Sequence, residues 1–238
     1  MYYLIAVILS LFTLVQPMQR AMFFGQNTSL AQPSGTGVTF VAFNSNNFSG
    51  CLSVSPCNYT VGSNPTAGNT LVVENDLNSG SATSSISSTG TGCSGTIWTA
   101  VGSATTEVSI IRVWIGVASG SGPCNLSFAL SDTVNSGVQV VEASGGSTVD
   151  SFTANNSCGG SGCSFTSSSA TTAASDLGIV FWAANSSSSP TATGWTFQSA
   201  TGNNFDGAFT QAITSSGTAV NFPGNGFASS AQAMVLIK

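Results

Sequence analysis

Apolar residues in this chain occur in short runs, which alternate with polar residues or are separated by clusters of Gly, Asn and Ser. The clearest alternation places Cys124, Leu126, Phe128 and Leu130 between polar or small residues. A two-residue period of this kind indicates a β-strand with one buried face and one face in water. We therefore expect this strand on the surface of a sandwich.

Two other runs predict strands with more buried surroundings. Leu177–Ala184 is apolar on both faces, which favours a central strand covered on each side, or one whose tryptophan-bearing face is wet. Along Val108–Val117, the odd positions 111–117 form a core row. Arg112 and Trp114 share the other face of that strand, which is a candidate surface.

Similar β-type runs recur along the chain between turn signals, and no helical pattern competes with them after the N-terminal leader. The predicted strands are Val38–Phe43, Thr70–Glu74, Thr96–Val101, Val108–Val117, Asn125–Leu130, Val138–Ala143, Leu177–Ala184, Ala208–Thr214 and Gln232–Ile237.

These short strands, with their long and uneven connections, predict an all-β fold: a two-sheet antiparallel β-sandwich of jelly-roll type, rather than an up-and-down barrel. One domain over residues 38–238 fits the size range of such folds. Two Ser- and Thr-rich stretches, Ser79–Thr91 and Ser164–Ser175, predict mobile loops or weak edge strands. No short internal repeat is evident.

The N-terminal residues 1–21 predict a signal peptide or an uncleaved anchor. The apolar run Tyr2–Val15 is short for a membrane span and resembles the apolar region of a signal peptide, although no Lys or Arg precedes it. Residues 22–37 are rich in polar residues, Gly and Pro, and predict a linker or extended arm. We expect a secreted or cell-surface protein that has no membrane contact after leader cleavage.

An even number of cysteines, six, favours disulfides over metal ligation in an exported chain. Local spacing pairs Cys51 with Cys57 and Cys158 with Cys163, which leaves Cys93 with Cys124 by elimination. Six cysteines allow fifteen connectivities, so this pairing is a prediction from spacing alone.

Charged residues are scarce. The 238 residues include no histidine, three basic residues and only 5% charged side chains. Without histidine, a Ser or Cys nucleophile lacks its usual base, and the only lysine is Lys238. A net charge of −5 with no basic patch argues against nucleic acid as a partner.

The acidic residues are scattered singly, and three of them are candidates for chemistry. Glu74 and Asp76 would face one way at a strand end, where a glycosidase-like carboxylate pair and a solvated strand terminus are both consistent with the pattern. Glu142 is predicted either to be buried with hydrogen-bond partners or to lie just past its strand. The segment Glu74–Asn78 is also a candidate structural calcium site, although its spacing does not match an EF-hand. No other cofactor is expected.

Tryptophans are the candidate ligand-binding residues. In a charge-poor sandwich, a flat ring covers the apolar face of a sugar while Asn, Gln or Ser bind its hydroxyls. Trp98, Trp114 and Trp195 are therefore the candidate carbohydrate-binding residues, although core packing is the favoured alternative for any single one of them. Trp195 follows a cluster of turn residues and is the one expected to be most exposed.

Several short motifs together resemble a poorly characterised family of secreted bacterial β-sandwich domains of cell-surface proteins. The motifs lie within Ala67–Lys238 and are Gly68–Val73, Thr96–Thr99, Val113–Ile115, Val140–Gly145, Ala174–Ile179, Gly194–Thr196 and Ala231–Lys238. The resemblance implies adhesion or glycan contact rather than catalysis, and it supplies no active site to carry over.

The sequence thus predicts a non-catalytic extracellular protein that binds a glycan or surface polymer. The alternative is a structural subunit of an extracellular filament or coat, in which copies of the chain assemble by strand exchange at unprotected sheet edges. A carboxylate-dependent glycosidase and an ice-binding protein are less favoured alternatives.

Overall fold

Every regular element that the structure describes is a β-strand. The structure is a computed structural model of the chain and describes residues 37–45, 55–77, 84–106, 109–131, 136–158, 163–171, 175–184, 190–198, 206–227 and 230–238. These residues belong to one compact unit, Thr36–Lys238. The predicted leader and nearly all of the predicted arm lie outside the described residues. The described residues include no helix of the length and apolarity that a membrane crossing requires.

The described residues form sixteen strands. The first eight are β1 (Thr39–Ser45), β2 (Cys57–Thr60), β3 (Thr70–Leu77), β4 (Ser84–Thr89), β5 (Thr99–Thr105), β6 (Ile110–Val117), β7 (Asn125–Leu130) and β8 (Ser136–Ser144). The last eight are β9 (Val149–Cys158), β10 (Cys163–Ala170), β11 (Leu177–Ala184), β12 (Thr191–Ala192), β13 (Thr196–Gln198), β14 (Asp206–Ala212), β15 (Ala219–Asn225) and β16 (Ser230–Ile237).

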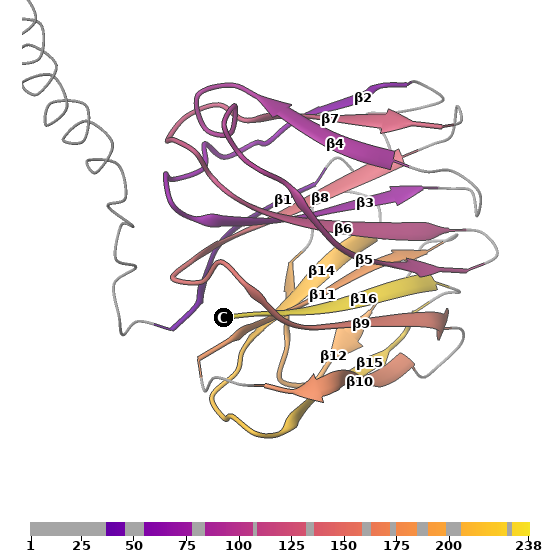
Figure 1. Ribbon diagram of the computed structural model, residues 1–238. Coiled ribbons are helices and arrows are strands. Elements are labelled where there is room, and N and C mark those ends of the chain that lie inside the picture. Colours follow the sequence, from indigo (N-terminus) through magenta and orange to yellow (C-terminus); the bar gives the residue numbers. More distant parts are fainter. Residues whose placement is uncertain are drawn as a thin grey trace, which may run out of the picture. The chain divides into compact units, whose positions relative to one another are not determined.

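The strands form four sheets, and every pairing within them is antiparallel. Sheet A has the order β1-β8-β3-β6-β5, sheet B β2-β7-β4, sheet C β13-β14-β11-β16-β9 and sheet D β10-β15-β12. The sheets stack in the order B, A, C, D, from top to bottom in Figure 1. The predicted all-β antiparallel sandwich is confirmed, and it has four layers where two were expected.

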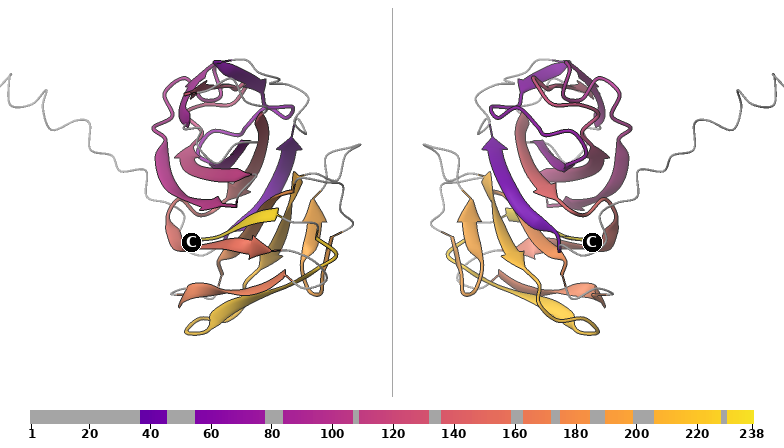
Figure 2. Two further views of the ribbon diagram at one scale, coloured as in Figure 1. Left: turned by 90° about the vertical axis from the view of Figure 1, so that its right-hand side faces the viewer. Right: turned by 90° about the vertical axis from the view of Figure 1, so that its left-hand side faces the viewer.

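The two halves of the chain have the same topology. Adding eight to each strand number converts the order of sheet A into that of sheet C, and the order of sheet B into that of sheet D. Eight antiparallel strands divided in this way between two packed sheets make a jelly roll. The chain therefore contains two jelly rolls, β1–β8 and β9–β16, coloured indigo to pink and orange to yellow in Figure 2.

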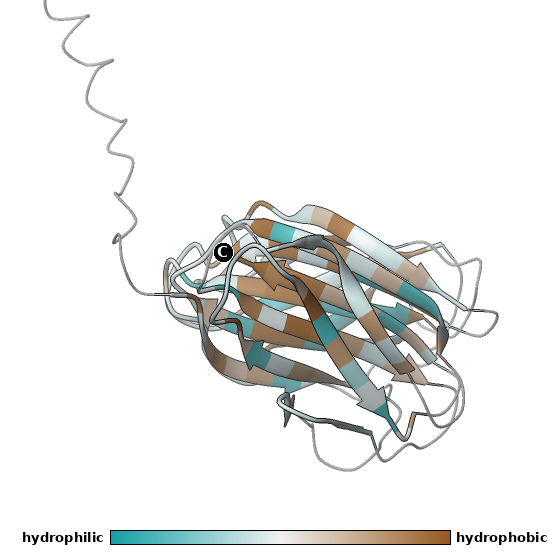
Figure 3. Ribbon diagram, turned by 90° about the horizontal axis from the view of Figure 1, so that it is seen from below, coloured by the Kyte–Doolittle hydropathy of each residue, from teal (hydrophilic) through white to brown (hydrophobic). Residues whose placement is uncertain are grey.

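Three apolar clusters hold the four layers together. The central cluster lies between sheets A and C, and includes Val113, Val141, Ile179, Phe181 and Val235. One outer cluster joins sheets A and B around Leu71, Leu126 and Phe128, and the other joins sheets C and D around Trp182, Phe209 and Phe222. Because successive side chains point to opposite faces of a sheet, a strand apolar on both faces can serve two clusters. The hydropathy of the strands is drawn in Figure 3.

Each of the predicted strands is confirmed, with ends that shift by a few residues at most. The predictions at Asn125–Leu130 and Leu177–Ala184 match β7 and β11 residue for residue. All eight residues of β11 are buried, as expected for a central strand. The two Ser-rich stretches contain β4 and all but the first residue of β10, and both are edge strands of the outer sheets. For these parts of the stretches, the edge-strand interpretation is therefore correct.

Two predictions along β6 are wrong. The face that carries Trp114 is not a surface, because sheet B covers it: Trp114 is 7% exposed, and its ring centroid lies 5.8 Å from that of Phe128. Val117, predicted in the core row, is 40% exposed because it is the last residue of the strand and lies outside the central cluster.

Two predicted disulfides are present, Cys93–Cys124 and Cys158–Cys163. Cys57 is disulfide-bonded as well, and Cys51, its partner by spacing, lies outside the described residues. Cys57 and Cys163 begin the equivalent strands β2 and β10, so the two rolls carry a disulfide cysteine at the same place in their topology. The disulfides are consistent with an extracellular protein.

Candidate functional site

Two of the three candidate tryptophans are core residues. Trp114 packs between sheets A and B, and Trp195 between sheets C and D, where 8% of it is exposed. The Trp195 indole donates to the carbonyl of Asn221 at 3.3 Å, and its ring meets Phe222 edge to face at 5.2 Å. The expectation that Trp195 is exposed is therefore wrong, because its side chain points to the apolar face of its segment.

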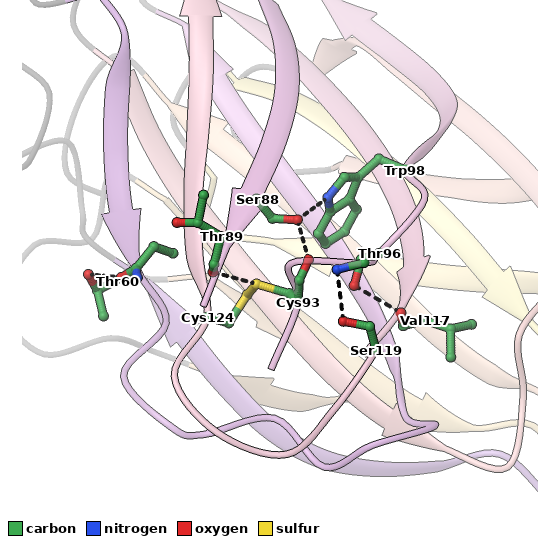
Figure 4. The surroundings of a disulfide bond; sticks show 11 residues. Thr60, Ser88, Thr89, Cys93, Thr96, Trp98, Val117, Ser119 and Cys124 are labelled. Carbon is green, nitrogen blue, oxygen red and sulfur yellow. Dashed lines mark hydrogen bonds between the residues drawn. A yellow bond between two sulfur atoms is a disulfide. The ribbon is translucent and has the colours of Figure 1, made fainter. Parts of the chain in front are cut away.

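Trp98 is the half-buried tryptophan and lies near the Cys93–Cys124 disulfide (Figure 4). Its indole nitrogen donates to the hydroxyl of Ser88 at 2.9 Å, which fixes the ring at the edge of sheet B. The preceding residue, Ile97, is 84% exposed. Carbohydrate binding by the tryptophans stays a prediction, and Trp98 offers more ring surface than the other two.

The predicted acids are buried, and they are not a solvated strand terminus. Glu74 and Asp76 are 0% exposed, because β3 runs on to Leu77 and sheet C covers the face on which they lie. Glu142 is 3% exposed and accepts hydrogen bonds from the backbone of Thr66 at 2.9 Å and the side chain of Asn69 at 2.6 Å. The buried, hydrogen-bonded alternative for Glu142 is therefore correct.

Glu74 and Asp76 form a cluster with a third acid, Asp206, which begins β14 in the other jelly roll. A Cβ atom on Gly137 would lie 2.1 Å from Oδ1 of Asp76 and 2.9 Å from Oδ2 of Asp206, so these two carboxyl groups lie close together. None of the six carboxyl oxygens accepts a well-formed hydrogen bond among the described residues. We refer to Glu74, Asp76 and Asp206 as the junction acids.

Burial dominates the electrostatics of the junction acids. Loss of hydration, reinforced by the charges of Asp76 and Asp206, raises the pKa of Glu74 well above its usual value. Burial and the charge of Asp206 likewise raise the pKa of Asp76, and burial raises the pKa of Asp206 to about 7. The neighbouring Gln139 amide opposes the shift at Glu74. Near neutral pH these carboxyl groups thus hold protons that exposed acids would have lost.

The junction acids are not a preformed metal cage. The part of the chain that the structure describes contains no group of three His, Cys, Asp or Glu side chains placed to hold a metal ion. In the predicted calcium segment, Asn75 points to the opposite face of β3 and donates to the Gly137 carbonyl at 2.7 Å, while Asn78 lies outside the described residues. A structural calcium ion therefore stays a prediction.

A hollow of about 420 Å³ lies where the edge of sheet A meets sheet C. Its lining comes from β1 and the residue before it, from β11, β13 and β14, and from the turn before β13. The lining residues are Val38, Thr39, Phe40, Leu177, Gly194, Thr196, Gln198, Thr210, Gln211 and Ala212. We call this site the edge hollow. On the other side of the junction, β5 and β9 pack closely against each other.

The edge hollow is neutral and rich in hydrogen-bonding groups. Among the described residues, its lining has no charged side chain, and half of the lining residues carry a hydroxyl or an amide. Gln198 donates to the hydroxyl of Thr210 at 3.1 Å. Gly194 has a φ of 83°, and a side chain there would approach the amide of Gln211. The half-buried ring of Phe40 supplies an aromatic surface.

None of the candidate ligand-binding tryptophans lines the edge hollow, although Trp195 lies between two residues that do, Gly194 and Thr196. The segment around Trp195 therefore contributes to the hollow, although the Trp195 ring itself does not line it. The hollow depends on the packing of β1 against β14, and β13 contributes to the same lining. β1 is distant from both strands in the sequence, and only the polar residues of Thr196–Gln198 give a local signal.

Comparisons with protein-family models, with curated proteins and with solved structures find no match to this chain. The resemblance to secreted bacterial sandwich domains therefore stays a prediction, and function has to be argued from the site itself.

Proposed function

We propose that this protein is a non-catalytic extracellular binding protein that holds a neutral glycan in the edge hollow. The observation that carries the proposal is the lining: hydroxyl and amide groups beside an aromatic ring, with no charge. Sugar hydroxyls exchange hydrogen bonds with such groups, and the apolar face of a sugar ring packs on an aromatic side chain.

The dimensions and accessibility of the hollow support this proposal. A volume of about 420 Å³ lies within the range of small-molecule sites, roughly 300–1,000 Å³. Thr39 and Thr196 are exposed, and Gln198 and Gln211 are half-buried, so a ligand from solvent can reach their polar atoms. Jelly rolls also occur among lectin domains, although that analogy concerns the fold alone.

A binding role fits the chemistry of the hollow better than a catalytic one. None of its described lining residues has a titratable side chain, so proton transfer to or from a bound sugar would need a group from elsewhere. The acids considered for glycoside hydrolysis lie outside this lining, and each is buried. Secretion is part of the proposal and is supported by the disulfides.

Binding to a glycan array of neutral oligosaccharides, followed by calorimetric titration of the strongest binder, tests the proposal. Replacing Gln198 and Gln211 together with alanine removes two hydrogen-bonding side chains and should weaken binding about tenfold or more. The matched control is Asn221→Ala, which removes an exposed amide on sheet D and should leave binding unchanged.

Two outcomes would count against the edge hollow as a glycan site. An array without any binder would refute the glycan proposal itself. If the double glutamine variant binds like the wild type while Trp98→Ala abolishes binding, the glycan lies instead on the predicted tryptophan surface.

A second candidate function, a coat or filament subunit, is favoured by an apolar surface beside the first residues of β5. Ile97 and Val117 are 84% and 40% exposed, and the hydroxyl of Thr96 joins their segments by donating to the Val117 carbonyl at 3.0 Å. Exposed apolar residues next to an edge strand favour association between copies. Light scattering should then show assemblies that Ile97→Lys reduces to monomers. A monomeric wild type at high concentration would exclude this role.

A further inference from the structure

The junction acids come from both jelly rolls. Glu74 and Asp76 belong to β3 of the first roll, whereas Asp206 belongs to β14 of the second. Within the sheets, Asp76 is paired with Gly137 on β8, and Asp206 with Ala183 on β11. The cluster therefore exists only while sheets A and C are packed together at this end of their shared face.

No described cation neutralises the junction acids. The residues around them are uncharged. Sheet A contributes Gly137 and Gln139 from β8 and Ile111 from β6, and sheet C contributes Ala183 from β11 and Ala231 and Ala233 from β16. Arg112 lies on the same face of β6 as Trp114, toward sheet B, and Lys238 pairs with Asp150 at 2.8 Å. Glu74, Asp76 and Asp206 are the titratable side chains that face this space among the described residues.

Three adjacent carboxyl groups in a buried space can be neutral only if they hold protons. An ionised carboxylate there would lack hydration and well-formed hydrogen bonds, and ionisation of Asp206 together with Asp76 would add repulsion between the rolls at short range. We propose that the junction acids make the packing of the two jelly rolls pH-responsive: when protonated they keep this end of the junction closed, and when ionised they loosen it.

The direction of the effect follows from proton linkage. Because the pKa of Asp206 in the folded protein, about 7, is higher than its ordinary value of 3.8, the folded state holds a proton that the unfolded state has lost between these values. Stability is therefore highest in acid and falls as the pH rises through this window, with Glu74 and Asp76 extending it upward. For each proton that the folded state retains and the unfolded state has lost, a rise of one pH unit increases the unfolding equilibrium constant about tenfold.

The test compares the wild type with the amide variant E74Q/D76N/D206N, in which neutral isosteres replace the protonated acids. Chemical denaturation from pH about 5 to about 9 should show the wild type losing stability and the variant losing much less. Hydrogen exchange, corrected for its intrinsic pH dependence, should show faster exchange in β8 and β14 of the wild type above neutral pH and no such change in the variant.

Asp176→Asn is the matched control. Burial and the adjacent Asp150 raise the pKa of Asp176 to about 6. This acid lies near Lys238, beside the first residues of β9 and β11, and away from the junction acids. D176N should therefore keep the loosening of β8 and β14 above neutral pH. If the triple variant folds poorly, D206N alone should remove the part of the pH dependence that lies below about pH 7, where folded Asp206 retains a proton that the unfolded chain has lost.

Three results would overturn the proposal. The first is a wild type equally stable across this pH range, and the second is a pH dependence that persists unchanged in the triple variant. The third is that millimolar CaCl₂ stabilises the wild type against denaturation at alkaline pH but does not stabilise the triple variant. A cation rather than protons would then neutralise the acids. None of these results depends on glycan binding.

Discussion

Gly137 controls how closely the junction acids can approach the backbone of sheet A. The position is buried and pairs with Asp76, and a Cβ atom there would lie within 3 Å of carboxyl oxygens of both Asp76 and Asp206. Glycine is required at this position because there is no room for a side chain, and not because of an unusual backbone conformation.

We expect Gly137→Ala to destabilise the protein by about 1–3 kcal/mol, the usual cost of inserting a methyl group into a packed interior. Measurement is by chemical denaturation at acid pH, where the junction acids are protonated. The control is Gly95→Ala, whose Cβ would lie 3.3 Å from Cβ of Ser119 at an exposed site and should change stability by less than about 0.5 kcal/mol. Equal stability of the two variants would show that the junction tolerates the extra atom.

The acids show what single-residue reasoning can and cannot predict. The alternation of its own strand was enough to include burial among the alternatives for Glu142. The same reasoning assigned Glu74 and Asp76 to a strand end, because polar residues are expected in water. Their burial depends on sheet C, and the third member of the cluster, Asp206, comes from a strand far along the chain. Local pattern carries no information about such partners.

At the scale of elements, strands with strong apolar patterns were predicted and the short polar ones were not; β9 and β15, ten and seven residues long, were also missed. β7 and β11 could be placed from the sequence because burial on one face, or on both, leaves a clear pattern. β2, β12 and β13 are four residues long or shorter, too short to show a period. β4 consists of Ser and Thr apart from Ile86, so composition alone left it open between loop and edge strand.

Strand faces were predicted less well than strand positions. A period of two shows that two faces differ, but an apolar residue on the second face can be exposed or covered by another layer. Trp114 and Trp195 were candidates for exposure, and outer sheets B and D cover them. A prediction of two layers made this error inevitable, since the outer sheets supply the cover.

At the scale of the whole molecule, the chain is two jelly rolls that share a core. The repetition is one of topology and disulfide placement, and the sequence does not display it, because each roll fills its core with different residues. The equivalent strands β3 and β11 illustrate this. At the fifth and seventh positions, β3 has Glu74 and Asp76 and β11 has Phe181 and Ala183, and all four side chains face the junction. One roll thus supplies most of the junction's acids and the other supplies apolar side chains.

Because the central cluster belongs to both rolls, we expect the molecule to unfold in one cooperative transition. Separating the rolls would expose the apolar faces of sheets A and C together, so neither roll keeps its stability without the other. Calorimetry should give equal calorimetric and van't Hoff enthalpies. Phe181→Ala, which removes a fully buried ring from the central cluster, should cost about 3–5 kcal/mol and reduce hydrogen-exchange protection in β7 as well as β15. Loss of protection confined to β15 in the second roll, or two separate transitions, would show that the rolls are independent domains and that the junction acids act on domain docking rather than on folding.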